Sequence, residues 1–140
     1  MQKSLLRLID ANGNRALEGL RVCEEVSRLH LNHAASYRRL RLLRHGVAAA
    51  LKRLPFSRQL LLSARDSQTD VGRRAPSAAV ESLEQLLVIN FQRAKEALRT
   101  LEECSRIVSV AAAADFQSLR FKLYTVERQT LLHVAVLRNR

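Results

Sequence analysis

The chain has 140 residues, enough for one domain that buries most of its apolar surface without disulfides or metals. Hydrophobic residues make up 47% and aromatic residues 4%, with only four Gly and two Pro, so the composition favours helices and argues against a sheet. The formal net charge is +11, and no apolar run reaches the roughly 20 residues of a membrane span.

The first predicted element is a helix over residues 4–30, whose apolar positions recur every three or four residues along one face. A short turn separates it from a second predicted helix over residues 34–54. The start of the chain lacks the apolar run and the cleavage site of a signal peptide, and Cys23 and Cys104 read as small buried side chains. We therefore expect a cytoplasmic protein.

A polar linker over residues 55–78 follows, interrupted by two prolines and a glycine. Its stretch 63–72 reads SARDSQTDVG and contains Arg65, Asp66 and Asp70. The Asp and Ser side chains can close local turns by accepting hydrogen bonds from backbone amides. Alternatively, so polar a loop covers a ligand site or contacts another domain.

Two more helices are predicted, over residues 79–110 and 115–138, and Asp115 is the expected N-cap of the last one. The third helix repeats the first. Residues 12–28 read NGNRALEGLRVCEEVSR and residues 90–106 read NFQRAKEALRTLEECSR, with ten of seventeen positions identical at a constant offset of 78. Most of the identical residues are polar, which a shared bias toward leucine does not produce.

The repeat predicts the fold class. We expect residues 1–140 to form one all-α domain, a four-helix bundle made of two duplicated helical hairpins with pseudo-twofold symmetry. The first copy covers residues 4–54 and the second covers 79–138. A weaker match after a one-residue shift aligns Arg41 with Arg120 in the second helices of the two copies.

Four repeated polar residues form a candidate site. Asn12 and Asn90 fall near the centre of an apolar face and must be hydrogen-bonded, while Arg15 and Arg93 lie one turn on, at the edge of that face. About a local twofold, the four side chains could converge and bind an anion such as phosphate. In the plainer alternative, each Asn bonds the backbone of the facing helix and each Arg pairs with a carboxylate.

Other charged residues favour structural interpretations. Glu18, Glu24 and Glu25 alternate with Arg21 and Arg28 at helical spacing, and the pattern recurs 78 residues later, so we expect surface ion pairs away from the apolar face. The segment 26–65 contains no acidic residue, which is either a solvated face or an attraction for phosphates or an acidic protein surface. The four histidines form no metal motif.

Three strings carry a family resemblance. LIDANGNRALEGLRVCEEVSR, ARDSQTDVG and NFQRAKEALRTLEE resemble, in this order, the helical domain at the N-terminus of some bacterial thiamine-phosphate synthases. The resemblance covers nearly the whole chain. Gly13 and Cys23 stand where the family pattern has larger apolar residues, a difference that concerns packing.

The resemblance implies a division of labour. In such enzymes a (β/α)₈ barrel, with magnesium, joins a hydroxymethylpyrimidine diphosphate to a thiazole phosphate, and that barrel needs about 200 residues or more. Catalysis and magnesium are thus expected in a barrel domain of the same or a neighbouring chain, with no catalytic residue and no cofactor here. An accessory role follows, through docking, formation of a homodimer, or sensing of a phosphate-containing small molecule. Asn12, Arg15, Asn90, Arg93, Arg65, Asp66 and Asp70 are the candidate anion or domain-contact residues.

Two other functions stay open. A small helical-bundle enzyme resembling chorismate mutase would use Arg15 and Arg93 to grip an anionic metabolite in a closed cavity. A nucleic-acid-binding module would use the acid-free segment 26–65, which offers only Tyr37 and Phe56 for stacking on bases.

Overall fold

The structure, a computed structural model, describes residues 2–138, with side-chain surroundings given through residue 135. It consists of five helices, and no strand occurs between residues 2 and 138, so the predicted all-α class is confirmed. The helices are α1 (Gln2–Leu29), α2 (Ala34–Arg53), α3 (Arg58–Ala64), α4 (Leu83–Val108) and α5 (Val110–Arg138).

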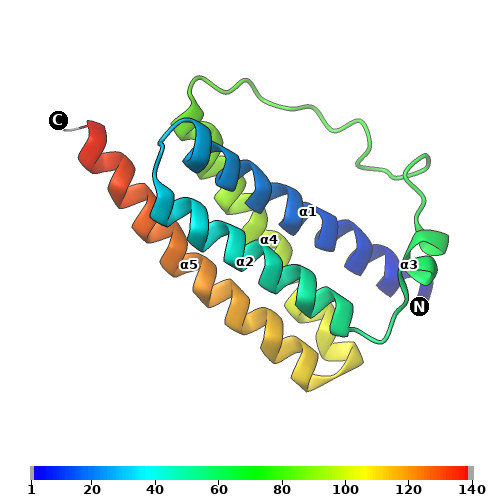
Figure 1. Cartoon of the computed structure of the whole chain (residues 1–140). Helices are drawn as coiled ribbons and strands as arrows, with labels where there is room; N and C mark the ends of the chain where they lie inside the picture. The colour runs from blue at the N-terminus through cyan, green and yellow to red at the C-terminus, as the bar shows by residue number, and fades with distance from the viewer. Residues whose placement is uncertain (1, 139–140) are drawn as a thin grey trace.

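The four long helices form an antiparallel bundle, with the short α3 packed on the N-terminal part of α1 (Figure 1). The end of α1 meets the start of α4, where His30 Nε2 lies 3.0 Å from Glu84 Oε1. The start of α2 meets the last turns of α5, where the rings of His33 and His133 stack with centroids 3.6 Å apart. Around the bundle the order is α1, α2, α5, α4, so each long helix runs antiparallel to both of its neighbours.

The core lies on the predicted apolar faces. At the crossing of α1 and α4, Ala16 and Ala94 are fully buried, and Phe91 and Phe116 are the largest fully buried side chains. Cys23 and Cys104 are buried as predicted, and loss of water around each sulfur raises the pKa of both thiols. These cysteines are therefore small core residues rather than reactive groups.

The helices differ from prediction in three places. One is α4, which begins at Leu83, four residues after the predicted start, because Ser82 Oγ accepts the capping bond from Gln85 N. The linker contains a helix, α3, which begins at an N-cap where Ser57 Oγ accepts a hydrogen bond from Leu60 N. In addition, α5 begins five residues before the predicted start, because Ser109 Oγ, not Asp115, accepts the capping bond, from Ala112 N. The alanines at 111–114 have the highest helix propensity and extend the helix backwards to that serine.

The predicted surface ion pairs form at Glu25 with Arg28, at 2.6 Å, and at Glu103 with Arg106, at 2.8 Å, whereas two other carboxylates of the pattern are buried and pair with a neighbouring helix. Glu24 and Glu102 are only 1% and 7% exposed. Arg44 Nε donates to Glu24 across α1 and α2 at 2.6 Å, and Arg120 Nε donates to Glu102 across α4 and α5 at 2.8 Å. The helix faces are wider than an apolar stripe suggests, so a carboxylate at the stripe's edge is covered when a second helix packs beside it.

The buried positions and ion pairs of the two hairpins can be compared with the predicted repeat. At the offset of 78, the buried residues of α1 and α4 coincide at most positions, among them Leu20 with Leu98 and Ser27 with Ser105. In the second helices, however, the contact counterpart of Arg120 is Arg44 rather than Arg41. The second hairpin has the shorter turn, one residue instead of four, which moves the register of α5. The duplication stays a prediction, which would explain these matched positions.

Candidate functional site

The linker after α3 runs back along α1 toward the start of α4 (Figure 1). Asp66 Oδ1 accepts a hydrogen bond from Thr69 N at 3.1 Å, and Asp70 Oδ1 accepts one from Gly72 N at 2.7 Å. Hydrogen bonds from the Thr69 hydroxyl and amide hold the pKa of Asp66 below its usual value. Both aspartates therefore close local turns, as the first interpretation of this segment predicted.

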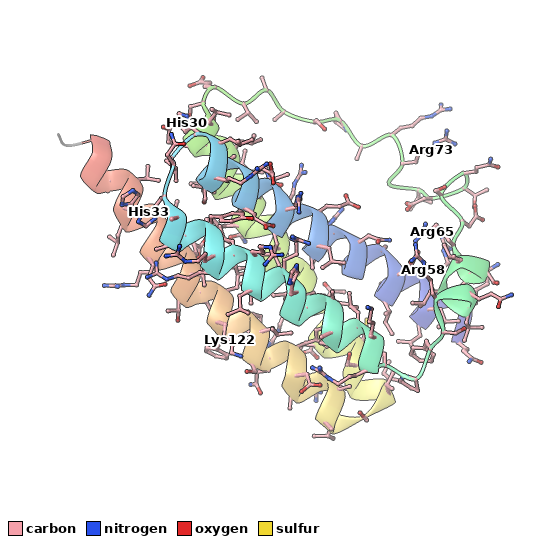
Figure 2. The ribbon with its side chains drawn as sticks, viewed as in Figure 1. His30, His33, Arg58, Arg65, Arg73 and Lys122 are labelled. Atoms are coloured by element: carbon pink, nitrogen blue, oxygen red, sulfur yellow. The ribbon has the colours of Figure 1, made fainter. Side chains whose placement is uncertain are left out.

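An ion pair fastens the start of the linker to α1. Arg65 donates from Nε and Nη2 to the two carboxylate oxygens of Asp10, at 2.7 and 2.8 Å, and this pairing raises the pKa of the guanidinium. One residue on, the Asp66 carbonyl accepts a hydrogen bond from Arg7 at 3.4 Å. Figure 2 shows Arg65 where α3 meets α1, and Arg73 farther along the linker, away from the helices.

Two adjoining cavities lie between the linker and the helices, and both reach Ala11. The first has a volume of about 440 Å³, and its lining includes Asn12, Arg65, Asp66 and Asp70. The second has a volume of about 680 Å³ and is lined by residues of α1, α4 and the linker, including Arg15, Asn90 and Arg93. The fold thus places all seven candidate residues, which the sequence scatters over more than eighty positions, along one continuous region.

The two asparagines behave differently from the expectation. Asn90 is buried, at 5% exposure, but Asn12 is only half-buried. Neither amide bonds the facing helix. Each Nδ2 donates to the carbonyl four residues earlier in its own helix, Leu8 O for Asn12 and Leu86 O for Asn90, both at 2.9 Å. The backbone of a helix offers this acceptor to an asparagine without any help from a neighbour.

The two arginines also depart from the plainer alternative. Among the ion pairs within residues 2–135, none includes Arg15 or Arg93, whereas the arginines on the neighbouring turns, Arg21 and Arg99, each pair with carboxylates. Glu18 lines the same cavity, so its fixed charges are two guanidinium groups and one carboxylate. The cavity therefore has a net positive charge, and its guanidinium groups are available to a ligand.

A glycine that sequence reasoning missed brings these residues together. A Cβ at Gly19 would lie 3.1 Å from Asn90 O and 3.4 Å from Ala94 N, so a larger residue here would push α1 and α4 apart by a few tenths of an ångström. Ala97 stands at the matching position of the predicted repeat, and this difference from Gly19 was the available signal. Ser77, on the linker, also lines the cavity and adds a hydroxyl donor that no motif indicated.

Other kinds of site find less support. No three His, Cys, Asp or Glu side chains within the described part of the chain are grouped so that they could hold a metal ion. His30 is exposed, while His33 is half-buried against His133. No helix within residues 2–138 is long and apolar enough to cross a membrane.

Fold and site together define a helical-bundle domain with a positively charged cavity beneath a polar linker. The model of the ThiD2 family matches residues 7–129, and the chain belongs to this family. Similar proteins are the thiamine-phosphate synthases of Rhodopirellula baltica (36% identical over 141 residues), Nostoc punctiforme (34% over 136) and Synechocystis (35% over 127). These findings confirm the resemblance seen in the sequence. No solved structure matches the chain.

The three alignments cover 99%, 95% and 89% of this chain but only 37%, 37% and 35% of the relatives. The chain thus spans little more than a third of the length of the curated relatives that it matches. It is a helical domain related to thiamine-phosphate synthases.

Proposed function

We propose that this chain is a ligand-binding domain of thiamine biosynthesis, which holds a phosphorylated small molecule in the cavity between α1, α4 and the linker. The observation that carries the proposal is the pair Arg15 and Arg93, which come from two different helices, line one cavity and have no carboxylate partner among the described ion pairs. Among the accessory roles expected from the sequence, this proposal assigns the binding of a ligand to the cavity.

The chemistry of the lining supports a phosphate ester as the ligand. A guanidinium group donates two parallel hydrogen bonds to a phosphate, and such charge-assisted bonds are about twice as strong as neutral ones. Asn90 and Ser77 add neutral polar groups beside Arg15 and Arg93. The relatives are named for thiamine phosphate, so the phosphorylated precursors of that molecule are the first candidates.

A thermal-shift titration tests this function. Phosphate, pyrophosphate and the two phosphorylated precursors would each be titrated into the chain, and a ligand at a hundredfold excess over its Kd stabilises the folded state by about 2.7 kcal/mol. We expect Arg15→Ala and Arg93→Ala each to reduce the rise in Tm, and the double variant to abolish it. The matched control is Arg41→Ala, which removes the same charge from an exposed site on α2 and should leave the rise unchanged.

Asn90→Ala separates binding from stability. Its amide bonds only its own helix, and alanine has the higher helix propensity by roughly 0.5 kcal/mol, so the ligand-free Tm should change little. We expect this variant to lose part of the ligand-induced shift. Absence of any shift at millimolar concentrations of all four probes in the wild type would end the proposal.

A small enzyme acting on the same anion is the second candidate, and Glu18 is the observation that favours it. A carboxylate beside two guanidinium groups could serve as a general base toward a bound phosphate ester. Against a mechanism like that of chorismate mutase, Arg15, Glu18 and Arg93 are all exposed, so water has access to the cavity. Phosphorus NMR of each precursor incubated with the chain, and with Glu18→Gln as the comparison, would reveal any turnover.

A further inference from the structure

The outer face of α2 and α5 lies on the side of the bundle away from the linker (Figure 1), and these two helices carry exposed cations. Its exposed cations come from the acid-free segment and from α5, and they are Arg38, Arg39, Lys122 and Arg128. The two carboxylates of α5 are already engaged, Asp115 with Arg53 at 3.3 Å and Glu127 with Lys95 at 3.0 Å. We call this surface the basic face.

An apolar groove runs through the basic face. A Cβ at Gly46 would lie 3.1 Å from Leu119 Cδ2, so the glycine lets α2 and α5 approach closely. Beside this contact lies a cavity of about 370 Å³, whose lining includes the aliphatic Leu42, Leu119 and Val126. Arg39 and Lys122 stand at its edges, and Figure 2 shows Lys122 on the side of α5 that faces α2.

Large apolar side chains stay exposed on α2 and α5, and of these Leu42 lines the groove. Leu42 is 75% exposed, Phe121 56% and Leu132 49%. Single exposed leucines are ordinary, but several on one face, mixed with cations, are typical of a protein interaction surface. Apolar residues are spread almost evenly around α5. Because no helix of the bundle packs on one side of α5, the apolar side chains on that side stay exposed.

We propose that the basic face docks an acidic amphipathic helix of a partner protein. Aliphatic side chains of that helix would enter the groove at Leu42 and Leu119, and its carboxylates would meet Arg39 and Lys122. A second copy of this chain does not fit, because it would bring the same positive charge to the contact. Nucleic acid does not fit the groove either, because aliphatic side chains offer bases no stacking surface.

The face is independent of the cavity beneath the linker. The linker lies against α1 and α4, whereas the groove lies between α2 and α5 (Figure 1). A partner on the basic face therefore leaves the phosphate cavity open, and the two proposals can be tested separately.

Fluorescence anisotropy with the full chain tests the docking. The probe is a labelled peptide of about 20 residues, with leucines at helical spacing on one face and glutamates elsewhere, and the comparison is a scrambled peptide of the same composition. At an ionic strength of about 0.15 M we expect the amphipathic peptide to bind at least about tenfold more tightly than the scrambled one. Leu42→Ser and Lys122→Glu should each weaken its binding at least about fivefold.

Matched controls make the result specific. Ile107→Ser changes an equally apolar side chain that is 62% exposed on α4, and Arg74→Glu reverses a charge on the linker. Both controls should bind the peptide as the wild type does. Far-UV circular dichroism and the Tm should stay unchanged in all four variants, because every substituted side chain is exposed.

Three outcomes would overturn the proposal. They are equal binding of the scrambled peptide, equal weakening by the control variants, and tighter binding of duplex RNA or phosphatidylserine vesicles that depends on Leu42 and Lys122.

Discussion

The hydrogen bonds of Asn12 and Asn90 do not explain these two residues by a contribution to the stability of the fold. Each amide bonds a carbonyl of its own helix, so neither side chain connects two elements. Alanine at either position would favour the helix, because asparagine competes with the backbone and has the lower helix propensity. Both asparagines line the cavities beneath the linker, which favours a role in binding over a role in folding.

Protonation of His33 affects the stability of the first turn of α2. Its Nδ1 accepts a hydrogen bond from Ser36 N as the N-cap of α2, and its ring stacks on His133. Burial, followed by the nearby His133 and Arg39, lowers the pKa of His33. The unfolded chain therefore takes up this proton first. The contribution of neutral His33 to stability is complete above the unfolded pKa of about 6.5 and is lost as the pH falls below it.

We predict accordingly that the urea midpoint of unfolding decreases as the pH falls from about 7 to about 5.5. In His33→Asn this slope should be shallower, because asparagine also caps a helix but does not titrate. The same change at the exposed His45 is the control, and it should keep the wild-type slope. A slope that His33→Asn leaves unchanged would show that other groups cause the pH dependence.

At the scale of elements, the two buried ion pairs decide how the helices of each hairpin meet. Arg120 donates both to Glu102, at 2.8 Å, and to the hydroxyl of Tyr124, at 3.2 Å. Removing Arg120 leaves the buried Glu102 carboxylate with only the exposed Arg99 beside it, at 3.2 Å, and a buried charge that loses its buried partner costs more than the pair contributes by itself. A pair of this kind fixes the register between helices more than it adds stability.

Arg120→Met should therefore lower the free energy of unfolding by about 3 kcal/mol. The double change Arg120→Met with Glu102→Leu should recover most of that loss, because no unpaired charge remains. Arg106→Met provides the comparison, since the Arg106 side chain is 67% exposed and its pair with Glu103 is worth at most about 1 kcal/mol. Urea unfolding measures all three variants, and a double variant no more stable than the single one would contradict this explanation.

For the whole molecule, the architecture separates two surfaces. The cavity with Arg15 and Arg93 opens beneath the linker on α1 and α4, and the basic face lies across the bundle on α2 and α5. A domain arranged in this way could hold a ligand while a partner is bound. One cluster of buried apolar side chains, drawn from α1, α2, α4 and α5, lies between the two surfaces.

The purified chain should not form thiamine phosphate from the two phosphorylated precursors, with or without magnesium. Residues 2–138 are helical with connecting loops, and they contain none of the parallel strands of a (β/α)₈ barrel. Chromatographic detection of the product checks this expectation. Product formation that a single substitution in this chain abolishes would refute it.

The sequence alone was sufficient for the all-α class, for the four long helices and for the residues around the linker, because each depends on local periodicity, helix propensity or an in-register repeat. It could not reveal that Glu24 and Glu102 are buried, since burial depends on which helix packs beside the stripe. It suggested that Arg15 and Arg93 could converge but left the alternative of separate ion pairs open, because the choice depends on how closely α1 and α4 approach at Gly19. Helix propensity and periodicity are local properties of the sequence, so they determine the helices. The burial and the partners of each charged side chain depend on contacts between residues far apart in the chain.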